Sequence, residues 1–184
     1  MSLQYALLGF LNYQPMTGYE LKQTMDVSTS NFWHAKQSQI YTTLKKMEGA
    51  GLVISQVEAQ DGRPDRRVYE ITDYGRAQLH TWLAEPLTEL QPHKELLLLK
   101  LFFAVPLDKQ TLLTQLRLQR DLHQRQAAIY RNETKAILQK LADSNPELEK
   151  DILLWEATRR FGEMFEEMNI NWLDETITMI EAKF

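Results

Sequence analysis

The amino-acid sequence predicts a mostly helical protein that carries one small β-hairpin in its first half. Apolar residues recur at three- and four-residue spacing through most of the 184 positions, which is the period of an α-helix. Residues 52–71 depart from this pattern. β-branched residues there flank a turn sequence, which is typical of a β-hairpin. Pro86 and Pro92 then bracket a boundary, beyond which only helical periodicity is present. The sequence therefore predicts two domains, residues 1–86 and residues 87–184.

The composition is that of an ordinary globular protein and excludes several classes. The chain has no cysteine, which excludes disulfide bonds and thiolate chemistry. It has no apolar run long enough to cross a bilayer, and its first residues lack the pattern of a secretory signal. We therefore expect a cytoplasmic protein that does not use a membrane. The net charge of −4 argues against nucleic-acid binding by the whole surface, so any such binding must be local.

Two helices are predicted in the first 28 residues. Leu3–Leu11 is almost continuously apolar, and its leucine content favours a buried helix over a strand. Thr17 and Glu20 have the spacing of a capping box, in which each side chain accepts a hydrogen bond from the other residue's backbone amide. A second helix is therefore expected to begin there. Phe32 and Trp33, in the polar connection that follows, are expected to anchor that connection in the core.

A third helix is expected over about residues 37–50, and its two faces differ in chemistry. Ile40, Leu44 and Met47 fall at i, i+4 and i+7, so they share one face and should pack on a core. Gly51 suits the left-handed position that ends a helix. The amphipathic pattern therefore leaves the opposite, polar face of this helix exposed.

That polar face carries lysines and short polar side chains, and no acid before Glu48. Short side chains allow close approach to base edges, glutamine can pair with adenine, and lysine can meet phosphate. The alternative is an ordinary solvated face, although such a face usually mixes both charge signs. The candidate DNA-binding residues of this region are Lys36, Ser38, Gln39, Tyr41, Thr42, Lys45 and Lys46.

A β-hairpin that carries arginines is predicted directly after the third helix. Leu52–Glu58 and Arg67–Ile71 are the expected strands, and the turn between them contains Gly62-Arg63-Pro64. A helix followed by such a hairpin is typical of a winged helix-turn-helix domain, with the helix in the major groove and the hairpin, residues 52–71, beside it as a wing. The alternative is a hairpin tip without a DNA-binding role. The candidate DNA-binding residues of the wing are Arg63, Arg66 and Arg67.

A fourth helix, from Thr72 to about Ala84, closes the first domain, and the second domain is predicted to be all-helical. A short apolar helix over residues 94–103 precedes a long helix over residues 108–142 and a last helix that starts near Pro146. Two amphipathic helices cannot cover the short apolar one, so we expect a second copy of the chain to do so. The alternative is packing of this segment on its own first domain. The candidate dimerisation residues are Leu96, Leu99, Phe102, Phe103, Trp155, Phe165, Met168 and Trp172.

Aromatic residues of the last helix raise a ligand-binding hypothesis. Trp155, Phe161 and Trp172 could line a pocket for a flat aromatic or apolar effector. At helical spacing, the alternative is that they are plain core or dimer interface. Aromatic composition alone does not decide between the two.

The sequence offers no catalytic constellation. His34, His80, His93 and His123 are scattered without metal-ligand spacing. A phosphate-binding loop, a nucleophile elbow and the HExxH pattern are all absent from the sequence. We therefore expect no catalytic residue, no metal and no cofactor.

Residues 3 to 85 resemble the PadR family of bacterial transcriptional regulators. The motifs that carry the resemblance are Ala6-Leu-Leu-Gly9, Thr17-Gly-Tyr-Glu-Leu21, Gln39-Ile-Tyr41 with Leu44, Gly51-Leu-Val53, Gly62-Arg-Pro64, and Tyr69-Glu-Ile-Thr72 with Gly75. The segment Phe32-Trp33-His34-Ala35 and the later Leu99-Lys-Leu-Phe-Phe103 resemble the subgroup that includes the virulence activator AphA.

This resemblance implies a homodimer with winged-helix domains at its ends that binds a roughly palindromic operator. It also implies DNA contacts from Tyr41, Lys45 and Lys46 in the third helix and from Arg63 in the wing, whereas Arg66 and Arg67 are added from their charge alone. Two alternatives stay open. One is a repressor gated by an apolar effector, and the other is a module in which the winged domain docks a protein instead of DNA.

Overall fold

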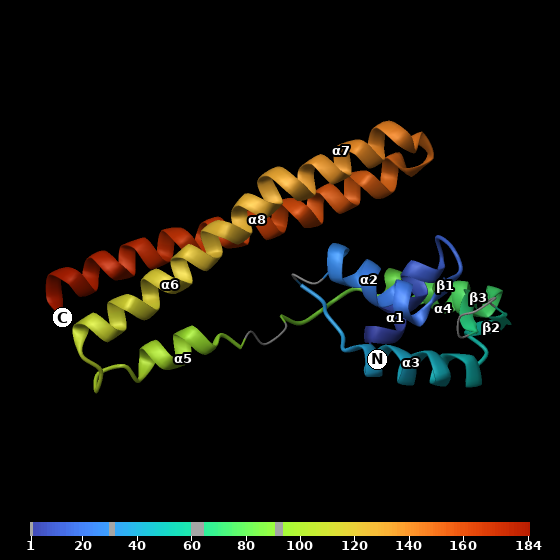
Figure 1. Cartoon of the computed structure of the whole chain (residues 1–184), viewed down its shortest axis with the longest axis horizontal. Helices are drawn as coiled ribbons and strands as arrows, with labels where there is room; N and C mark the ends of the chain where they lie inside the picture. The colour runs from blue at the N-terminus through green and yellow to red at the C-terminus, as the bar shows by residue number, and fades with distance from the viewer. Residues whose placement is uncertain (1, 30–31, 60–64, 91–93) are drawn as a thin grey trace. The chain divides into compact units, whose positions relative to one another are not determined.

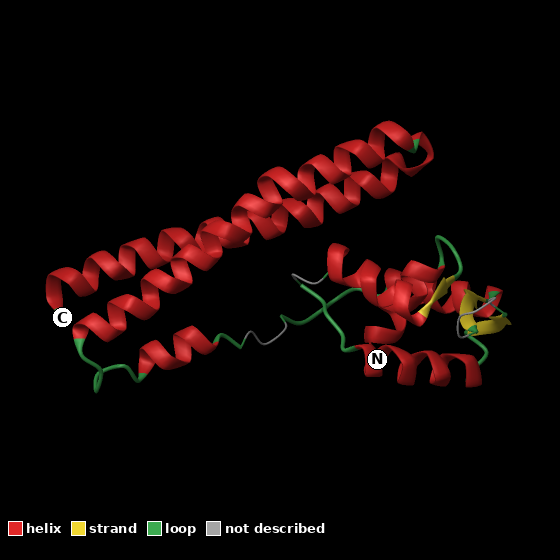
Figure 2. Ribbon diagram, in the orientation of Figure 1, coloured by secondary structure: helices red, strands yellow, loops and turns green. Residues whose placement is uncertain are grey.

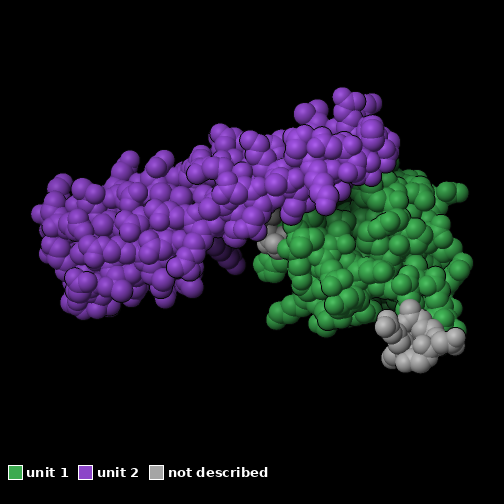
Figure 3. All heavy atoms as spheres, turned by 45° about the horizontal axis from the view of Figure 1, so that its top comes forward, with its two compact units in different colours: residues 1–91 green, residues 92–184 purple. Residues whose placement is uncertain are grey.

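The structure is a computed structural model, and it describes residues 2–29, 32–59, 65–90 and 94–184. The chain divides into two compact units, residues 1–91 and residues 92–184 (Figures 1 and 3). Within the described ranges, helices dominate both units and the strands belong to the first (Figure 2). The predicted fold class, mostly helical with a small β-sheet, is therefore confirmed. No helix in the described ranges combines the length and the apolarity that a membrane span requires.

The first unit packs four helices against a small sheet. Its innermost side chains come from α1, α2 and α3, and Leu8, Leu21, Ile40 and Leu44 have no exposed surface. The apolar face predicted for the third helix is thus confirmed. The elements in chain order are α1 (Ser2–Leu11), β1 (Met16–Thr17), α2 (Gly18–Ser28), α3 (Gln37–Gly49), β2 (Val53–Glu58), β3 (Arg66–Ile71) and α4 (Asp73–Ala84).

The sheet has three antiparallel strands in the order β1-β3-β2. The hairpin of β2 and β3 was predicted, whereas β1 was not. Met16 and Thr17 pair with Tyr69 and Val68 on β3, and two residues are too few to show an alternating pattern in the sequence. Thr17 also begins α2, since its hydroxyl accepts from the Glu20 amide at 3.1 Å and the Glu20 carboxylate accepts from the Thr17 amide at 2.7 Å. The predicted capping box is confirmed.

A glycine ends α3 and directs the chain into the wing. Gly51 has a φ angle of +71°, a conformation that is costly for residues with a Cβ atom. The amide of Leu52 donates to the carbonyl of Met47, and the amide of Gly51 donates to that of Glu48. This pair of bonds is the Schellman motif, and it brings β2 directly after the helix.

The connection between α2 and α3 differs from the prediction. Phe32 and Trp33 are 50% and 40% exposed, so they do not anchor the core. Among the described residues of this connection, Ala35 enters the core and is 7% exposed. The two aromatic side chains lie at the surface here, where connections between helices usually run.

The second unit is a long helical hairpin with one short helix beside it. The first arm is a continuous helical run of α6 (Lys109–Ala128), a π-helical segment (Ile129–Thr134) and α7 (Lys135–Ser144). After a 3₁₀ turn (Pro146–Leu148), α8 (Glu149–Lys183) returns antiparallel along this arm (Figure 1). Leu116 and Leu173 form the centre of the core between the arms, and α5 (Leu96–Phe102) adds Leu97 and Leu101 at its edge.

Candidate nucleic-acid interface

The polar face of α3 is open along its whole length. Every predicted DNA-binding residue of α3 and its N-cap is exposed, namely Lys36, Ser38, Gln39, Tyr41, Thr42, Lys45 and Lys46. Lys36, Lys45 and Lys46 form no ion pair with any residue of the described ranges. Three ammonium groups are therefore available to an anionic partner.

Hydrogen bonds at the start of α3 define what its first turn can offer. The side-chain oxygen of Gln39 accepts from the Lys36 amide at 2.9 Å, which stabilises the helix start. Bidentate pairing of Gln39 with adenine would need this oxygen, so the side chain would have to leave the cap. Its amide nitrogen, in contrast, can already donate to an acceptor outside the protein. Thr42 donates to the Ser38 carbonyl at 2.8 Å and keeps lone pairs free to accept.

Tyr41 is held in place by the start of α2. A Cβ atom built on Gly18 would lie 2.6 Å from Cε1 of Tyr41, so the ring rests directly against the Gly18 backbone. The side chain nevertheless remains 43% exposed. A fixed, half-exposed aromatic ring at the middle of the polar face is suited to contact a rigid surface, because little rotamer entropy remains to be lost.

Among the described residues, Arg66 and Arg67 of the wing have acidic partners, unlike the lysines of α3. Nε of Arg66 lies 2.9 Å from the Glu58 carboxylate, and its Nη1 lies 3.8 Å from that of Glu20. The pKa of Glu20 is lowered, first by its hydrogen bond with the Thr17 amide and to a smaller extent by Arg66. Arg67 is bonded within the unit as well, to the Ser55 hydroxyl and the Glu48 carboxylate. The prediction from the sequence missed the acidic partners of both arginines. Arg63, the third predicted wing residue, lies outside the described residues.

The predicted dimerisation residues of the second unit are exposed on α5 and its C-cap, and exposed or half-buried on α8. No residue of α5 is buried. Leu96, Leu99, Phe102 and Phe103 are between 57% and 80% exposed, although their neighbours Leu97 and Leu101 pack on the core. On α8, Met168 is 53% exposed, and Trp155, Phe165 and Trp172 are half-buried.

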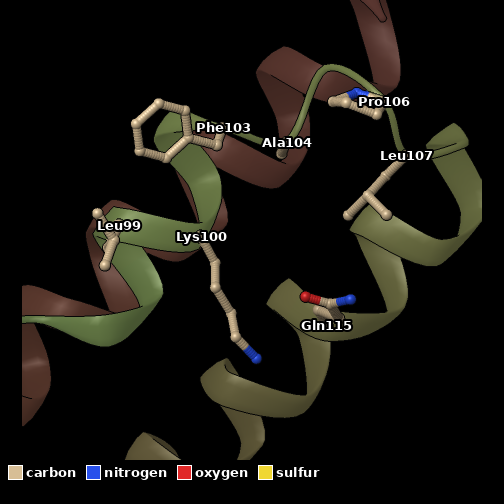
Figure 4. A pocket seen from close by; sticks show the side chains of 7 residues that line it. All are labelled: Leu99, Lys100, Phe103, Ala104, Pro106, Leu107 and Gln115. Atoms are coloured by element: carbon tan, nitrogen blue, oxygen red, sulfur yellow. The ribbon is translucent and has the colours of Figure 1, made fainter.

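An apolar groove of about 440 Å³ lies between α5 and the start of α6. Lys100 and Gln115 extend into the space between the two helices (Figure 4). The other lining residues are Leu99, Phe103, Ala104, Pro106 and Leu107. The groove therefore combines apolar walls with one ammonium group and one amide.

The aromatic residues predicted to bind a ligand are not brought together. Trp155 and Trp172 lie on the same α8, and at a rise of about 1.5 Å per residue they are roughly 25 Å apart. Phe161 is 65% exposed, and its ring centroid lies 6.4 Å from that of Phe165. Among the residues that the structure describes, histidine and acidic side chains form no group of three suited to a metal ion.

The second unit contains a buried ionic cluster that sequence reasoning missed. Arg159 is 6% exposed, and its Nη1 donates at 2.9 Å to both the Tyr130 carbonyl and the Glu163 carboxylate. Arg131 and Arg160 also contact Glu163. Hydrogen bonds from Arg159, followed by those from the other two arginines, lower the pKa of Glu163 to about 2. Tyr130 lies in the π-helical segment, so the cluster fixes this irregular backbone to α8.

Both halves of the chain match sequence models of known families. Residues 7–81 match the transcriptional regulator PadR-like family, and residues 93–181 match the virulence activator alpha C-terminal family. The chain is 35% identical over 193 residues to the probable transcriptional regulator Rv1176c of Mycobacterium tuberculosis, with all of both chains covered. It is 28% identical over 184 residues to the negative transcriptional regulator PadR of Bacillus subtilis, with 97% of each chain covered.

Solved structures share the fold over nearly the whole chain. Bacillus subtilis PadR in complex with operator DNA has a TM-score of 0.83 at 24% identity, with 97% of each chain covered. The Vibrio cholerae virulence activator AphA has a TM-score of 0.73 at 25% identity, with 99% of each chain covered. Bacillus subtilis PadR in complex with p-coumaric acid has a TM-score of 0.66 at 26% identity and covers 98% of this chain and 99% of its own.

Proposed function

We propose, because this chain belongs to the PadR-like family of transcriptional regulators, that it binds a roughly palindromic DNA operator as a homodimer. The observation that carries the proposal is the open polar face of α3, where Lys36, Lys45 and Lys46 have no acidic partner among the described residues. An anionic rod such as DNA is the partner that this face suits best.

In this proposal the first unit is the DNA-binding domain and α3 enters the major groove. Lys45 and Lys46 contact phosphates, and Gln39 and Thr42 reach base edges. The wing of β2 and β3 lies beside the helix. Bacillus subtilis PadR, which shares this fold over nearly the whole chain, has been solved in complex with operator DNA, and this supports a DNA-binding role for the fold. In this proposal the role is regulatory and not catalytic, and the protein acts in the cytoplasm, where the bacterial chromosome lies.

The function is tested by fluorescence anisotropy with duplex segments from the region upstream of the protein's own gene. Selective, saturable binding supports the proposal when it also weakens with salt. The logarithm of the association constant should fall by about 0.9 per phosphate contact for each tenfold rise in salt concentration. Equal binding to all segments would indicate non-specific affinity only. No salt-sensitive binding to any duplex, including those from a genome-wide selection, would contradict the function and favour a protein-docking module.

The homodimer follows from the exposed apolar surface of the second unit. α5 and its C-cap expose the large apolar side chains of Leu96, Leu99, Phe102 and Phe103, and exposed apolar side chains gathered in this way often mark an interface with another protein. A second copy can cover this patch with the same patch, as two-fold symmetry requires. The dimer also supplies the two α3 helices that a palindromic operator needs. The second unit is therefore the dimerisation domain in this proposal.

Replacing Phe102 by glutamate should weaken the dimer. Phe102 is 80% exposed within one chain, so the change costs the monomer fold little, but it places a charge in the proposed interface. We expect the dissociation constant measured by sedimentation velocity to rise at least about tenfold, since burial of a phenylalanine contributes about 2 kcal/mol. Val27→Glu, at an 83% exposed position of α2, is the control and should leave the constant unchanged. An unchanged constant in the Phe102 variant would exclude α5 from the interface.

A second candidate function, control by an effector, is favoured by the groove between α5 and α6. The groove combines apolar walls with the Lys100 ammonium group, and the related Bacillus subtilis PadR has been solved with p-coumaric acid, an aromatic acid. Addition of p-coumaric acid to the protein–operator complex should then release DNA in an anisotropy assay. A panel of aromatic and aliphatic acids that leaves the complex intact would count against this function.

A further inference from the structure

Arg67 on β3 takes part in a three-membered hydrogen-bonded group that joins the wing to α3. Its Nε donates to the Ser55 hydroxyl at 2.7 Å, and its Nη2 lies 3.3 Å from the Glu48 carboxylate. The Ser55 hydroxyl in turn donates to Glu48 at 2.5 Å. The three side chains come from three elements, α3, β2 and β3, and each of them bonds to both of the others.

The position of this group in the sheet explains why it is polar. Val53 pairs with Ile71, and both side chains are buried on the face of the sheet that meets the core. Ser55 lies opposite Tyr69 on the same face, and Arg67 follows two residues further toward the wing tip. The apolar core therefore ends at Tyr69, which is 4% exposed, and beyond it the wing is held to α3 by the polar triangle.

The negative charge of Glu48 is unfavourable for binding DNA, so its presence in α3 points to another role. It is the one acid in α3, the helix that is proposed to face DNA, and its charge repels phosphate. Arg67 is half-exposed and would be an ordinary phosphate contact if it were free. The pairing offsets the repulsion between Glu48 and phosphate and makes Arg67 less available to phosphate. It also holds β3 in a defined position against α3.

We propose that Glu48, Ser55 and Arg67 form a clasp that sets the angle of the wing against the recognition helix, and that Glu48 and Arg67 are positioning residues for operator binding. This inference rests on the proposed DNA-binding function. In it Arg67 acts through Glu48 and not on phosphate. The wing must meet the DNA backbone while α3 is seated in the groove, so loss of the clasp misplaces one element relative to the other.

The test compares the wild-type dimer with Glu48→Ala, Arg67→Ala and the double variant by anisotropy on one operator duplex at several salt concentrations. We expect Glu48→Ala to weaken binding about tenfold, although loss of a negative charge alone would tighten it. The double variant should bind no worse than either single variant, because both remove the same clasp. Arg67→Ala should keep the wild-type salt slope, since a lost phosphate contact would reduce it by about 0.9.

Two further variants separate positioning from charge. Glu48→Gln can still accept from Ser55 and Arg67, so its affinity should stay within about threefold of the wild type. Glu70→Ala, at an exposed position of β3 in the same sheet, removes the same charge without touching the clasp and should leave binding equal or tighter. Tighter binding by Glu48→Ala, together with a smaller salt slope in Arg67→Ala, would overturn the proposal and make Arg67 a phosphate contact.

Amide hydrogen exchange of the free protein tests the clasp without DNA, so its result does not depend on the DNA-binding function. Residues 53–58 and 66–71 should exchange several-fold faster in Glu48→Ala and Arg67→Ala than in Glu70→Ala, because the clasp restrains the two strands. Faster exchange with a wild type that binds no duplex would support the clasp and contradict the function. Unchanged exchange would overturn the clasp whatever the DNA result.

Discussion

Replacement of both Lys45 and Lys46 by alanine is expected to weaken operator binding about 100-fold at physiological salt. Both ammonium groups lie on the exposed face of α3, and no acid of the described residues pairs with them. Phosphate therefore has no protein carboxylate to displace. Loss of two phosphate contacts should also reduce the log–log salt slope by about 1.8, at about 0.9 per contact. Anisotropy titrations of one operator duplex over a series of salt concentrations measure both effects.

A control with the same charge change distinguishes local contacts from overall charge. Lys140→Ala combined with Lys150→Ala also removes two positive charges, from exposed positions of α7 and α8 in the second unit. This control should bind operator within about twofold of the wild type, because neither lysine belongs to the helix that is proposed to contact phosphate. If the α3 double variant bound as tightly as the control, α3 would not be the element that faces DNA.

Most of the first unit could be predicted because its signals are local. Ile40, Leu44 and Met47 fall on one side of a helix by their spacing alone, and all three are buried. Gly51 adopts the left-handed conformation that its position after the helix indicated. Such signals involve residues within two turns of each other, so no knowledge of tertiary contacts is needed.

The partners of the wing arginines could not be predicted because they lie far away in the sequence. Glu48 precedes Arg67 by 19 positions and belongs to another element. Glu20, near Arg66, lies before α3 altogether. A charge count along the chain therefore treats Arg66 and Arg67 as free cations, whereas the fold places carboxylates beside them. The lysines of α3 pair with no acid of the described residues, because Glu48, the one acid of their helix, is bonded to Ser55 and Arg67 instead.

The buried ionic cluster of the second unit was equally inaccessible to sequence reasoning. Arg159 and Glu163 are four residues apart, which is the spacing of an ordinary pair on a solvated helix face. Only the π-helical segment of the opposite arm shows why they are buried. That segment presents the Tyr130 carbonyl to Arg159, and no local pattern in Ile129–Thr134 predicts a π-helix.

Arg159→Ala is expected to lower the free energy of unfolding of the second unit by about 4 kcal/mol at neutral pH. The change leaves the Glu163 carboxylate, at 6% exposure, with only the more exposed Arg131 and Arg160. It also removes the buried donor to the Tyr130 carbonyl. Urea unfolding followed by circular dichroism measures the loss, at one fixed protein concentration because the proposed dimer makes stability depend on concentration. Arg160→Ala removes a half-exposed partner of the same carboxylate and should cost less than about 1 kcal/mol.

The loss of stability in Arg159→Ala should depend on pH, whereas the loss from a simple packing defect would not. Arginine hydrogen bonds hold the pKa of Glu163 at about 2, below its ordinary value of 4.5, so the ionised group stabilises the fold above that ordinary value. This contribution is lost as pH falls through about 2. In Arg159→Ala the pKa rises toward the ordinary value, and less of the contribution remains to be lost. The stability difference between variant and wild type should therefore narrow from pH 5 toward about pH 2. A difference that stays constant over this range would show that Arg159 acts through packing and its bond to the Tyr130 carbonyl, and not through the charge of Glu163.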